Sequence, residues 1–99
     1  MRKKGLAQEA EVITVTERAK EELKAMLITA EAEPDEGLRL LPRPDGRFEL
    51  MLGTELSGDQ VVEYEEAKVL LVGIEYFKLF EAKTVDCQDT VDGTALFVR

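Results

Sequence analysis

The residues of this 99-residue chain that could do chemistry are mostly acidic. Asp86, Asp89 and Asp92 recur at every third position and are followed by Gly93. Clustered carboxylate oxygens are the ligands that Ca²⁺ and other hard cations prefer. The spacing differs from that of an EF-hand, whose ligands stand at alternate positions and end in a glutamate. We therefore expect a solvated acidic turn and keep the three aspartates only as weak candidates for a metal site.

Cys87 is the single cysteine, and a thiol can serve as a metal ligand or a nucleophile. It belongs to a predicted strand in which alternation places Val85 and Cys87 on one face and Asp86 on the other. A free cysteine often behaves as a small buried hydrophobe, and an iron–sulfur cluster normally requires four thiolates. We predict that Cys87 packs in the core and binds no cofactor.

Two arginines could form a small binding patch. Arg43 and Arg47 flank the segment Pro44-Asp45-Gly46, which is a typical turn sequence. Side by side on an acidic protein, they could bind an anion or a partner. The alternative is that they are ordinary solvated charges of a hairpin, which contribute little to stability. The sequence favours the second interpretation.

The composition argues against catalysis. The chain has no histidine, one cysteine and a single serine, Ser57. A Ser-His-Asp or Cys-His site would therefore lack its base, and a structural zinc site would lack its four Cys or His ligands. The segment Gly53–Gly58 lacks the Lys-Ser/Thr pair of a phosphate-binding loop. We predict that the protein is not an enzyme and holds no cofactor.

Charge and hydropathy limit the partners. The chain has 13 basic and 21 acidic residues, and its net charge of −8 repels nucleic-acid phosphates. The longest apolar run, Val69–Val72, is far shorter than the roughly 20 residues of a membrane span. The basic start turns acidic too soon for a signal peptide, so residues 1–11 are expected to form a flexible tail. We expect a cytoplasmic protein whose partner is another protein or a second copy, with no nucleic acid and no membrane.

One amphipathic helix is predicted near the N-terminus, after a short strand at residues 12–15. Its apolar face has helical spacing, and the helix should end before Pro34. Thr14 and Thr16 both fit as the N-cap. The face consists of Ala19, Leu23, Met26, Leu27 and Ala30.

The remainder of the chain predicts strands. The first two should form an antiparallel hairpin around Pro44-Asp45-Gly46, and the strand at 69–72 should be buried on both faces. Residues 75–80 favour one or two helical turns. Loops are predicted at 34–37, 53–59 and 88–93, and strands at 38–41, 48–52, 61–64, 69–72, 83–87 and 94–98. Residues 12–99 are thus predicted to form a single β-rich α+β domain.

Several short strings in this order resemble the HesB/IscA-like family of A-type iron–sulfur cluster assembly proteins. The resemblance covers most of residues 12–98. It implies a compact pseudo-barrel or sandwich of about six to seven short strands with one N-terminal amphipathic helix. The strings are Ile13-Thr14-Val15-Thr16-Glu17-Arg18-Ala19, Gly37-Leu38-Arg39-Leu40, Asp59-Gln60-Val61-Val62-Glu63-Tyr64, Lys68-Val69-Leu70-Leu71-Val72, the apolar Phe77, Leu79 and Phe80, and Val85-Asp86.

The sequence departs from the family at its ligands. The family binds iron or a cluster through one cysteine after the Gly-Leu-Arg-Leu strand and two in a C-terminal Cys-x-Cys tail. Here the first region reads Pro42–Arg47 without a cysteine, and the sequence ends at Arg99 before any such tail. The resemblance therefore implies that no ligand residue carries over.

The functional prediction follows from this departure. We expect a non-enzymatic HesB/IscA-like domain protein related to iron–sulfur cluster biogenesis. It would be unable to ligate a cluster in the family manner and would act as a binding or regulatory partner. The alternative is a carboxylate-based metal- or small-ligand-binding module on the same fold, with no iron–sulfur role.

Overall fold

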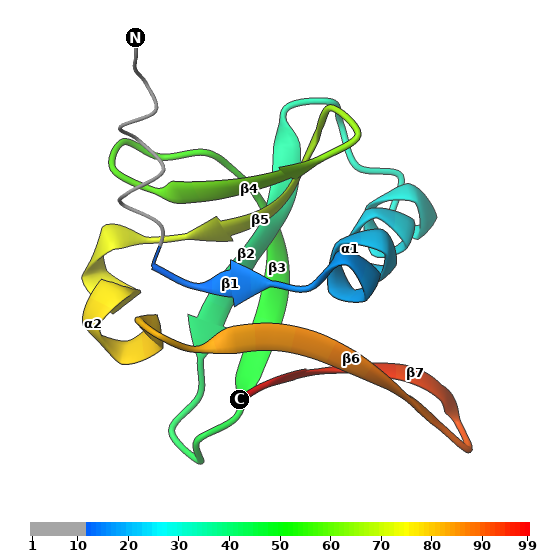
Figure 1. The fold of residues 1–99 in the computed structure, drawn as a ribbon. Helices are drawn as coiled ribbons and strands as arrows, with labels where there is room; N and C mark the ends of the chain where they lie inside the picture. Colours follow the sequence, from blue (N-terminus) through cyan, green and yellow to red (C-terminus); the bar gives the residue numbers. More distant parts are fainter. Residues whose placement is uncertain (1–11) are drawn as a thin grey trace, which may run out of the picture.

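A computed structural model describes residues 12–99, so the tail expected at residues 1–11 lies outside the described residues. Seven strands and two helices follow one another along the chain (Figure 1). A 3-10 turn, Ile74–Tyr76, leads directly into α2. The elements are β1 (Thr14–Val15), α1 (Glu17–Thr29), β2 (Glu36–Pro42), β3 (Phe48–Thr54), β4 (Gln60–Tyr64), β5 (Ala67–Val72), α2 (Phe77–Phe80), β6 (Thr84–Thr90) and β7 (Gly93–Val98).

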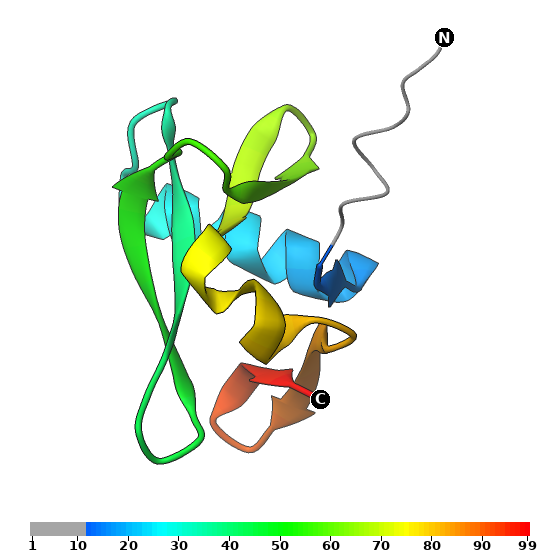
Figure 2. The same cartoon turned by 90° about the vertical axis from the view of Figure 1, so that its left-hand side faces the viewer.

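The strands form two sheets. The larger has the order β3-β2-β5-β4 and the smaller has the order β1-β6-β7. Neighbours are antiparallel except β2 with β5 and β1 with β6, which run parallel. Helix α1 contacts strands of both sheets, and the β2–β3 turn projects beyond the other strands of its sheet (Figure 2). The predicted β-rich α+β class is confirmed.

Helix α1 begins and ends where its sequence directs. Thr16 is the N-cap, because its Oγ1 accepts a hydrogen bond from the Ala19 amide at 3.2 Å. Glu31 follows the helix with a left-handed φ of 57°, which stops it ahead of Pro34. The predicted apolar face is buried except at its margins, where Met26 is half-buried and Ala30 is exposed. The buried members are Ala19, Leu23 and Leu27.

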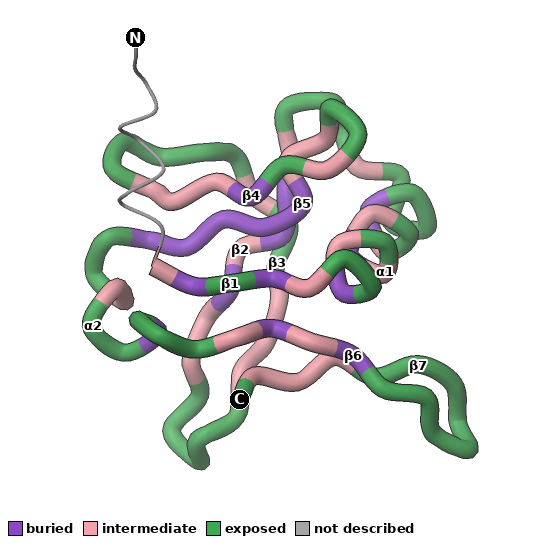
Figure 3. The backbone as a smooth tube through the Cα atoms, in the orientation of Figure 1, coloured by how far each residue is buried: buried purple, intermediate pink, exposed green. Residues whose placement is uncertain are grey.

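Strand β5 runs through the centre of the core. Val69, Leu70, Leu71 and Val72 each have 0% exposure, so this strand is buried on both faces as predicted (Figure 3). It lies between β2 and β4. The backbones of β2 and β5 approach closely at Gly37, where a Cβ would lie 2.6 Å from the carbonyl oxygen of Lys68. A glycine is therefore required at this contact.

The predicted hairpin of β2 and β3 is confirmed. Its strands pair antiparallel with Leu40 opposite Leu50. Arg43 N donates to the Arg47 carbonyl at 2.9 Å, and Gly46 takes a positive φ of 86° that its missing side chain permits. The turn therefore brings Arg43 and Arg47 to its two sides.

Some predicted boundaries were wrong because strand pairing extends further than the local sequence indicates. Strand β2 begins at Glu36, inside the predicted loop 34–37, since Glu36 pairs with Thr54. Strand β6 continues to Thr90, so the connection predicted at 88–93 shrinks to a turn at residues 91–92.

The first strand is shorter than predicted, because the side chain of Gln60, and not a neighbouring strand, hydrogen-bonds the backbone of residues 12 and 13. Only Thr14 and Val15 form β1. Gln60 binds the backbone just before it: Oε1 accepts from Val12 N at 2.6 Å and from Ile13 N at 3.0 Å. Gln60 Nε2 donates to the Ile13 carbonyl at 3.1 Å. One amide side chain thus satisfies backbone groups that a strand would otherwise pair.

Within residues 12–99, no helix has the length and apolar character that crossing a membrane requires.

Candidate functional site

A cleft of about 220 Å³ lies where the β2–β3 turn meets α2 and the end of β7. Three separate parts of the chain build it: the β2–β3 hairpin, α2 with the segment that follows it, and the end of β7. Arg43 and Arg47 line it from the turn, and Lys83 lines it from the segment before β6. The structure thus places both arginines of the predicted patch at one concave surface and adds a third cation.

The two arginines have internal partners. Arg43 Nη1 pairs with Glu49 Oε1 on β3, and Arg47 Nε pairs with Asp45 Oδ2 at 3.0 Å within the turn. Among the ion pairs of residues 12–99, none includes Lys83. The positive charge of Lys83 is therefore not neutralised by a carboxylate of the described chain.

The cleft also has an apolar wall. Phe80 is buried, whereas Leu79 on the same short helix is 52% exposed. Val98 and Phe48 complete this wall from β7 and β3. An exposed leucine beside a cationic rim makes the cleft amphipathic.

The backbone turn after α2 positions Lys83 at the cleft. Ala82 has a left-handed φ of 65°, and its N–H donates to the Val12 carbonyl at 3.1 Å. The Lys83 N–H donates to the Phe80 carbonyl at 3.0 Å, which closes the chain back over the end of α2. Sequence reasoning missed Lys83, since no local pattern links it to a turn some 40 positions earlier.

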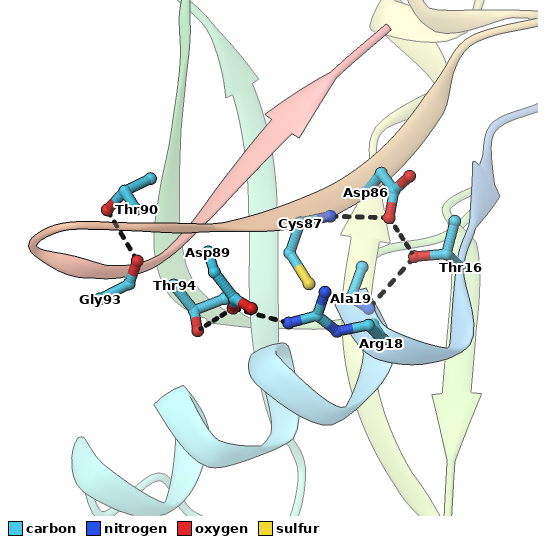
Figure 4. Close-up of polar contacts among 9 residues, drawn as sticks. All are labelled: Thr16, Arg18, Ala19, Asp86, Cys87, Asp89, Thr90, Gly93 and Thr94. Carbon is cyan, nitrogen blue, oxygen red and sulfur yellow. Dashed lines mark hydrogen bonds and ion pairs between the residues drawn. The ribbon is translucent and has the colours of Figure 1, made fainter.

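The weak metal candidate Asp86 has a structural role. Its Oδ1 accepts from Cys87 N at 2.8 Å and from Thr16 Oγ1 at 2.9 Å (Figure 4). Its Oδ2 accepts from Arg99 Nη2 at 3.0 Å. These bonds hold the pKa of Asp86 below its usual range, with the Cys87 amide contributing most. Asp86 therefore ties β6 to the N-cap of α1.

Asp89 and Asp92 do not join Asp86. Asp89 lies on β6, where Arg18 Nη2 donates to it at 2.9 Å and Thr94 Oγ1 at 3.4 Å (Figure 4). Asp92 lies in the exposed β6–β7 turn. In the part of the chain that the structure describes, no group of three His, Cys, Asp or Glu side chains is arranged to hold a metal ion. Nothing in this geometry favours the carboxylate-based module.

Cys87 lies in the interior. It is 7% exposed and stands opposite Leu96 in the ladder between β6 and β7. Val85, on the same face of β6, is also buried, whereas Asp86 between them is half-buried. A thiol in this position packs as a small apolar side chain.

The fold is the one found in A-type iron–sulfur cluster assembly proteins, as the resemblance implied. No family model matches the sequence, and no curated protein matches it. Among solved structures, SufA of Escherichia coli, which is involved in the biosynthesis of iron–sulfur clusters, has a TM-score of 0.71 at 19% identity, over 90% of this chain and 85% of that chain.

Two further solved structures share the fold. IscA with a [2Fe-2S] cluster has a TM-score of 0.66 at 17% identity, over 88% of this chain and 83% of that chain. A protein from Aquifex aeolicus has a TM-score of 0.57 at 22% identity, over 89% of this chain and 90% of that chain. The likeness covers nearly the whole domain, and at these identities it establishes the fold.

Proposed function

We propose that this protein is a non-enzymatic binding or regulatory partner in iron–sulfur cluster biogenesis that does not itself ligate a cluster through thiolates. The proposal that the protein does not ligate a cluster rests on the residues found where ligands would be expected. The β2–β3 turn, where the family resemblance implies the first cysteine ligand, carries Arg43 and Arg47, and the one thiol of the sequence is 7% exposed. A thiolate must reach the metal to bind it, whereas Cys87 is buried on one face of β6.

The link to iron–sulfur metabolism is supported by the likeness of fold to SufA and IscA. A change of ligand residues on a retained fold is consistent with a protein that contacts the assembly machinery without carrying the cargo. Its proposed partner is a protein or a second copy in the cytoplasm, because a net charge of −8 disfavours nucleic acid. Within residues 12–99, β3 and β4 are the edge strands of the larger sheet, and they are the proposed places for such a contact.

The ligation proposal is tested by anaerobic reconstitution with ferrous iron and sulfide. After desalting, we expect less than stoichiometric iron and no visible cluster absorption. IscA, whose solved structure holds a [2Fe-2S] cluster, is treated in parallel as the positive control. The Cys87→Ser variant should behave as the wild type does. A stoichiometric cluster in the wild type would contradict the proposal, whether or not the variant loses it.

The process proposal needs a separate measurement. A loaded A-type scaffold is mixed with an apo-ferredoxin, and cluster transfer is followed by circular dichroism with and without this protein. We expect the transfer rate to change in proportion to added protein. An unchanged rate at a large molar excess, together with no binding to either protein, would contradict a role in this process.

A further inference from the structure

The cleft beside the β2–β3 turn has the size and the lining of a small-molecule site. Its volume of about 220 Å³ is below the range typical of drug-sized ligands. It lies between secondary-structure elements distant in sequence, so its walls are held by the fold. The occupant should therefore be small, with one polar end.

The apolar wall indicates a hydrocarbon body. Its apolar members are Leu79 and Phe80 of α2, Val98 of β7 and Phe48 of β3. Leu79 is 52% exposed although it is a large aliphatic side chain. A hydrocarbon group seated in the cleft would remove this surface from water, which is favourable in proportion to the area covered.

The cationic rim indicates a single negative charge. Arg43 pairs with Glu49 and Arg47 pairs with Asp45, so that among the three cations of the lining only the charge of Lys83 is left without an ion pair within residues 12–99. A monoanion balances this charge. A dianionic phosphate would leave an excess negative charge on a chain that already carries −8.

We propose that this cleft binds a small amphipathic monocarboxylate, with its carboxylate at Lys83 and its hydrocarbon body against Leu79 and the neighbouring apolar wall. The ammonium of Lys83 offers up to three hydrogen-bond donors. The guanidinium groups of Arg43 and Arg47 keep their ion pairs with Glu49 and Asp45 and add to the positive electrostatic potential at the carboxylate. The proposal is independent of an iron–sulfur role, because reconstitution and cluster transfer do not involve this ligand.

Octanoate is a suitable probe, and binding is followed by chemical shifts of the ¹⁵N-labelled protein during titration. We expect saturable shifts centred on the amides of Arg47, Leu79 and Lys83. Octanol lacks the charge and acetate lacks the chain, so each should bind at least about tenfold more weakly than octanoate. Inorganic phosphate should also bind more weakly.

Two variants test the two ends of the ligand. Lys83→Gln should weaken octanoate binding about fivefold or more by removing a charge-assisted bond. Leu79→Ser should weaken it to a similar extent by removing apolar contact. Lys78→Gln is the matched control, because Lys78 lies on the same helix but does not line the cleft. Its affinity should stay within about twofold of the wild type.

Three results would overturn the proposal. The first is an absence of saturable shifts at the cleft. The second is octanoate binding that Lys83→Gln and Lys78→Gln affect equally. The third is phosphate or octanol binding as tight as octanoate binding, which would reduce the cleft to a general anion patch or an apolar groove.

Discussion

Arg39 and Asp59 form a two-bond ion pair that is almost withdrawn from solvent. Arg39 Nη2 lies 2.7 Å from Asp59 Oδ2 and Nη1 lies 3.3 Å from Oδ1. The Asp59 side chain is 2% exposed and the Arg39 side chain 16%. Asp59 Oδ2 also accepts from Leu56 N at 2.7 Å, and Arg39 Nη2 donates to the Thr54 carbonyl at 3.0 Å. The pair therefore fixes the loop between β3 and β4 against β2.

Replacing Arg39 by methionine should destabilise the protein by about 2–4 kcal/mol, because a buried carboxylate loses its partner. Urea unfolding at neutral pH measures the loss. Arg47→Met is the matched control, since the Arg47 and Asp45 side chains are 82% and 50% exposed and their pair should contribute less than about 0.5 kcal/mol. Equal losses in the two variants would contradict a special role for Arg39.

Acid should destabilise the fold through Asp59 and Asp86. Burial opposes ionisation of Asp59, but hydrogen bonds from Arg39 and the Leu56 amide outweigh it, and its pKa is lowered. The Asp86 pKa is lowered by the Cys87 amide, Thr16 and Arg99. In both cases the aspartate binds more protons in the unfolded chain than in the folded protein. The difference occurs between the lowered folded pKa and the ordinary pKa of about 3.9.

This stabilisation is thus fully present above the ordinary pKa and is lost as the pH falls through the lowered folded value. In denaturant titrations from neutral pH downward, Asp86→Asn should make the loss of stability below about pH 4 shallower. Arg99→Gln should have a smaller effect in the same direction, since it removes one of three partners of Asp86. A steeper loss in either variant would contradict the assignment.

Gln60→Ala should loosen the entry to β1. The variant leaves Val12 N, Ile13 N and the Ile13 carbonyl without their partner, at a cost of about 1–3 kcal/mol. Hydrogen exchange at the Val12 and Ile13 amides should become faster. Gln88→Ala on the exposed part of β6 is the control and should leave these amides unchanged. Equal exchange in both variants would show that Gln60 does not hold the segment.

Thr16→Ala should cost about 1–2 kcal/mol, because Thr16 caps α1 and also donates to Asp86 Oδ1. Thr16→Ser keeps the hydroxyl and should recover most of the loss. Thr14→Ala tests the other threonine that the sequence allowed as a cap, and its exposed side chain predicts a change within about 0.5 kcal/mol. Thermal unfolding of the three variants decides between the two positions, and a larger loss at Thr14 would contradict the structure.

Glu66→Gly should stabilise the protein by about 0.5–1 kcal/mol. Glu65 and Glu66 form the β4–β5 turn with positive φ values of 52° and 68°, which glycine adopts at little steric cost. Glu65 is left in place because it pairs with Lys24 at 2.9 Å. Glu63→Gly within β4 is the control and should destabilise by a similar amount. Urea unfolding distinguishes them by the sign of the change.

Local sequence signals were sufficient for much of the fold. The helix period, the Pro44-Asp45-Gly46 turn and the apolar run at 69–72 each depend on neighbouring residues, and each predicted element is present. Strand ends were predicted less well, because the pairing of Asp89 with Thr94 is decided by the partner strand. Residues 88–90, which the local sequence predicts to be part of a loop, therefore belong to β6.

The sequence predicted only part of the candidate site. Arg43 and Arg47 stand out because they flank a turn, and the structure places both at the cleft. Lys83 and Leu79 line the same cleft because the tertiary fold brings α2 and the segment after it to the hairpin, which no spacing in the sequence encodes. The same limit applies to Gln60 and Ile13, whose hydrogen bonds join residues 47 positions apart.

The parallel pairing of β1 with β6 has a consequence for biosynthesis. Thr14 pairs with Thr84, and Thr16 bonds to Asp86 across 70 positions. A strand that far downstream leaves the ribosome long after α1 has emerged, and closing so long a loop is entropically costly. The apolar face of α1, with Ala19, Leu23 and Leu27, therefore stays partly exposed to solvent while the rest of the domain is translated. Completion of this domain is expected to be a late step that waits for β6 to emerge, and until then the nascent chain is open to capture by chaperones.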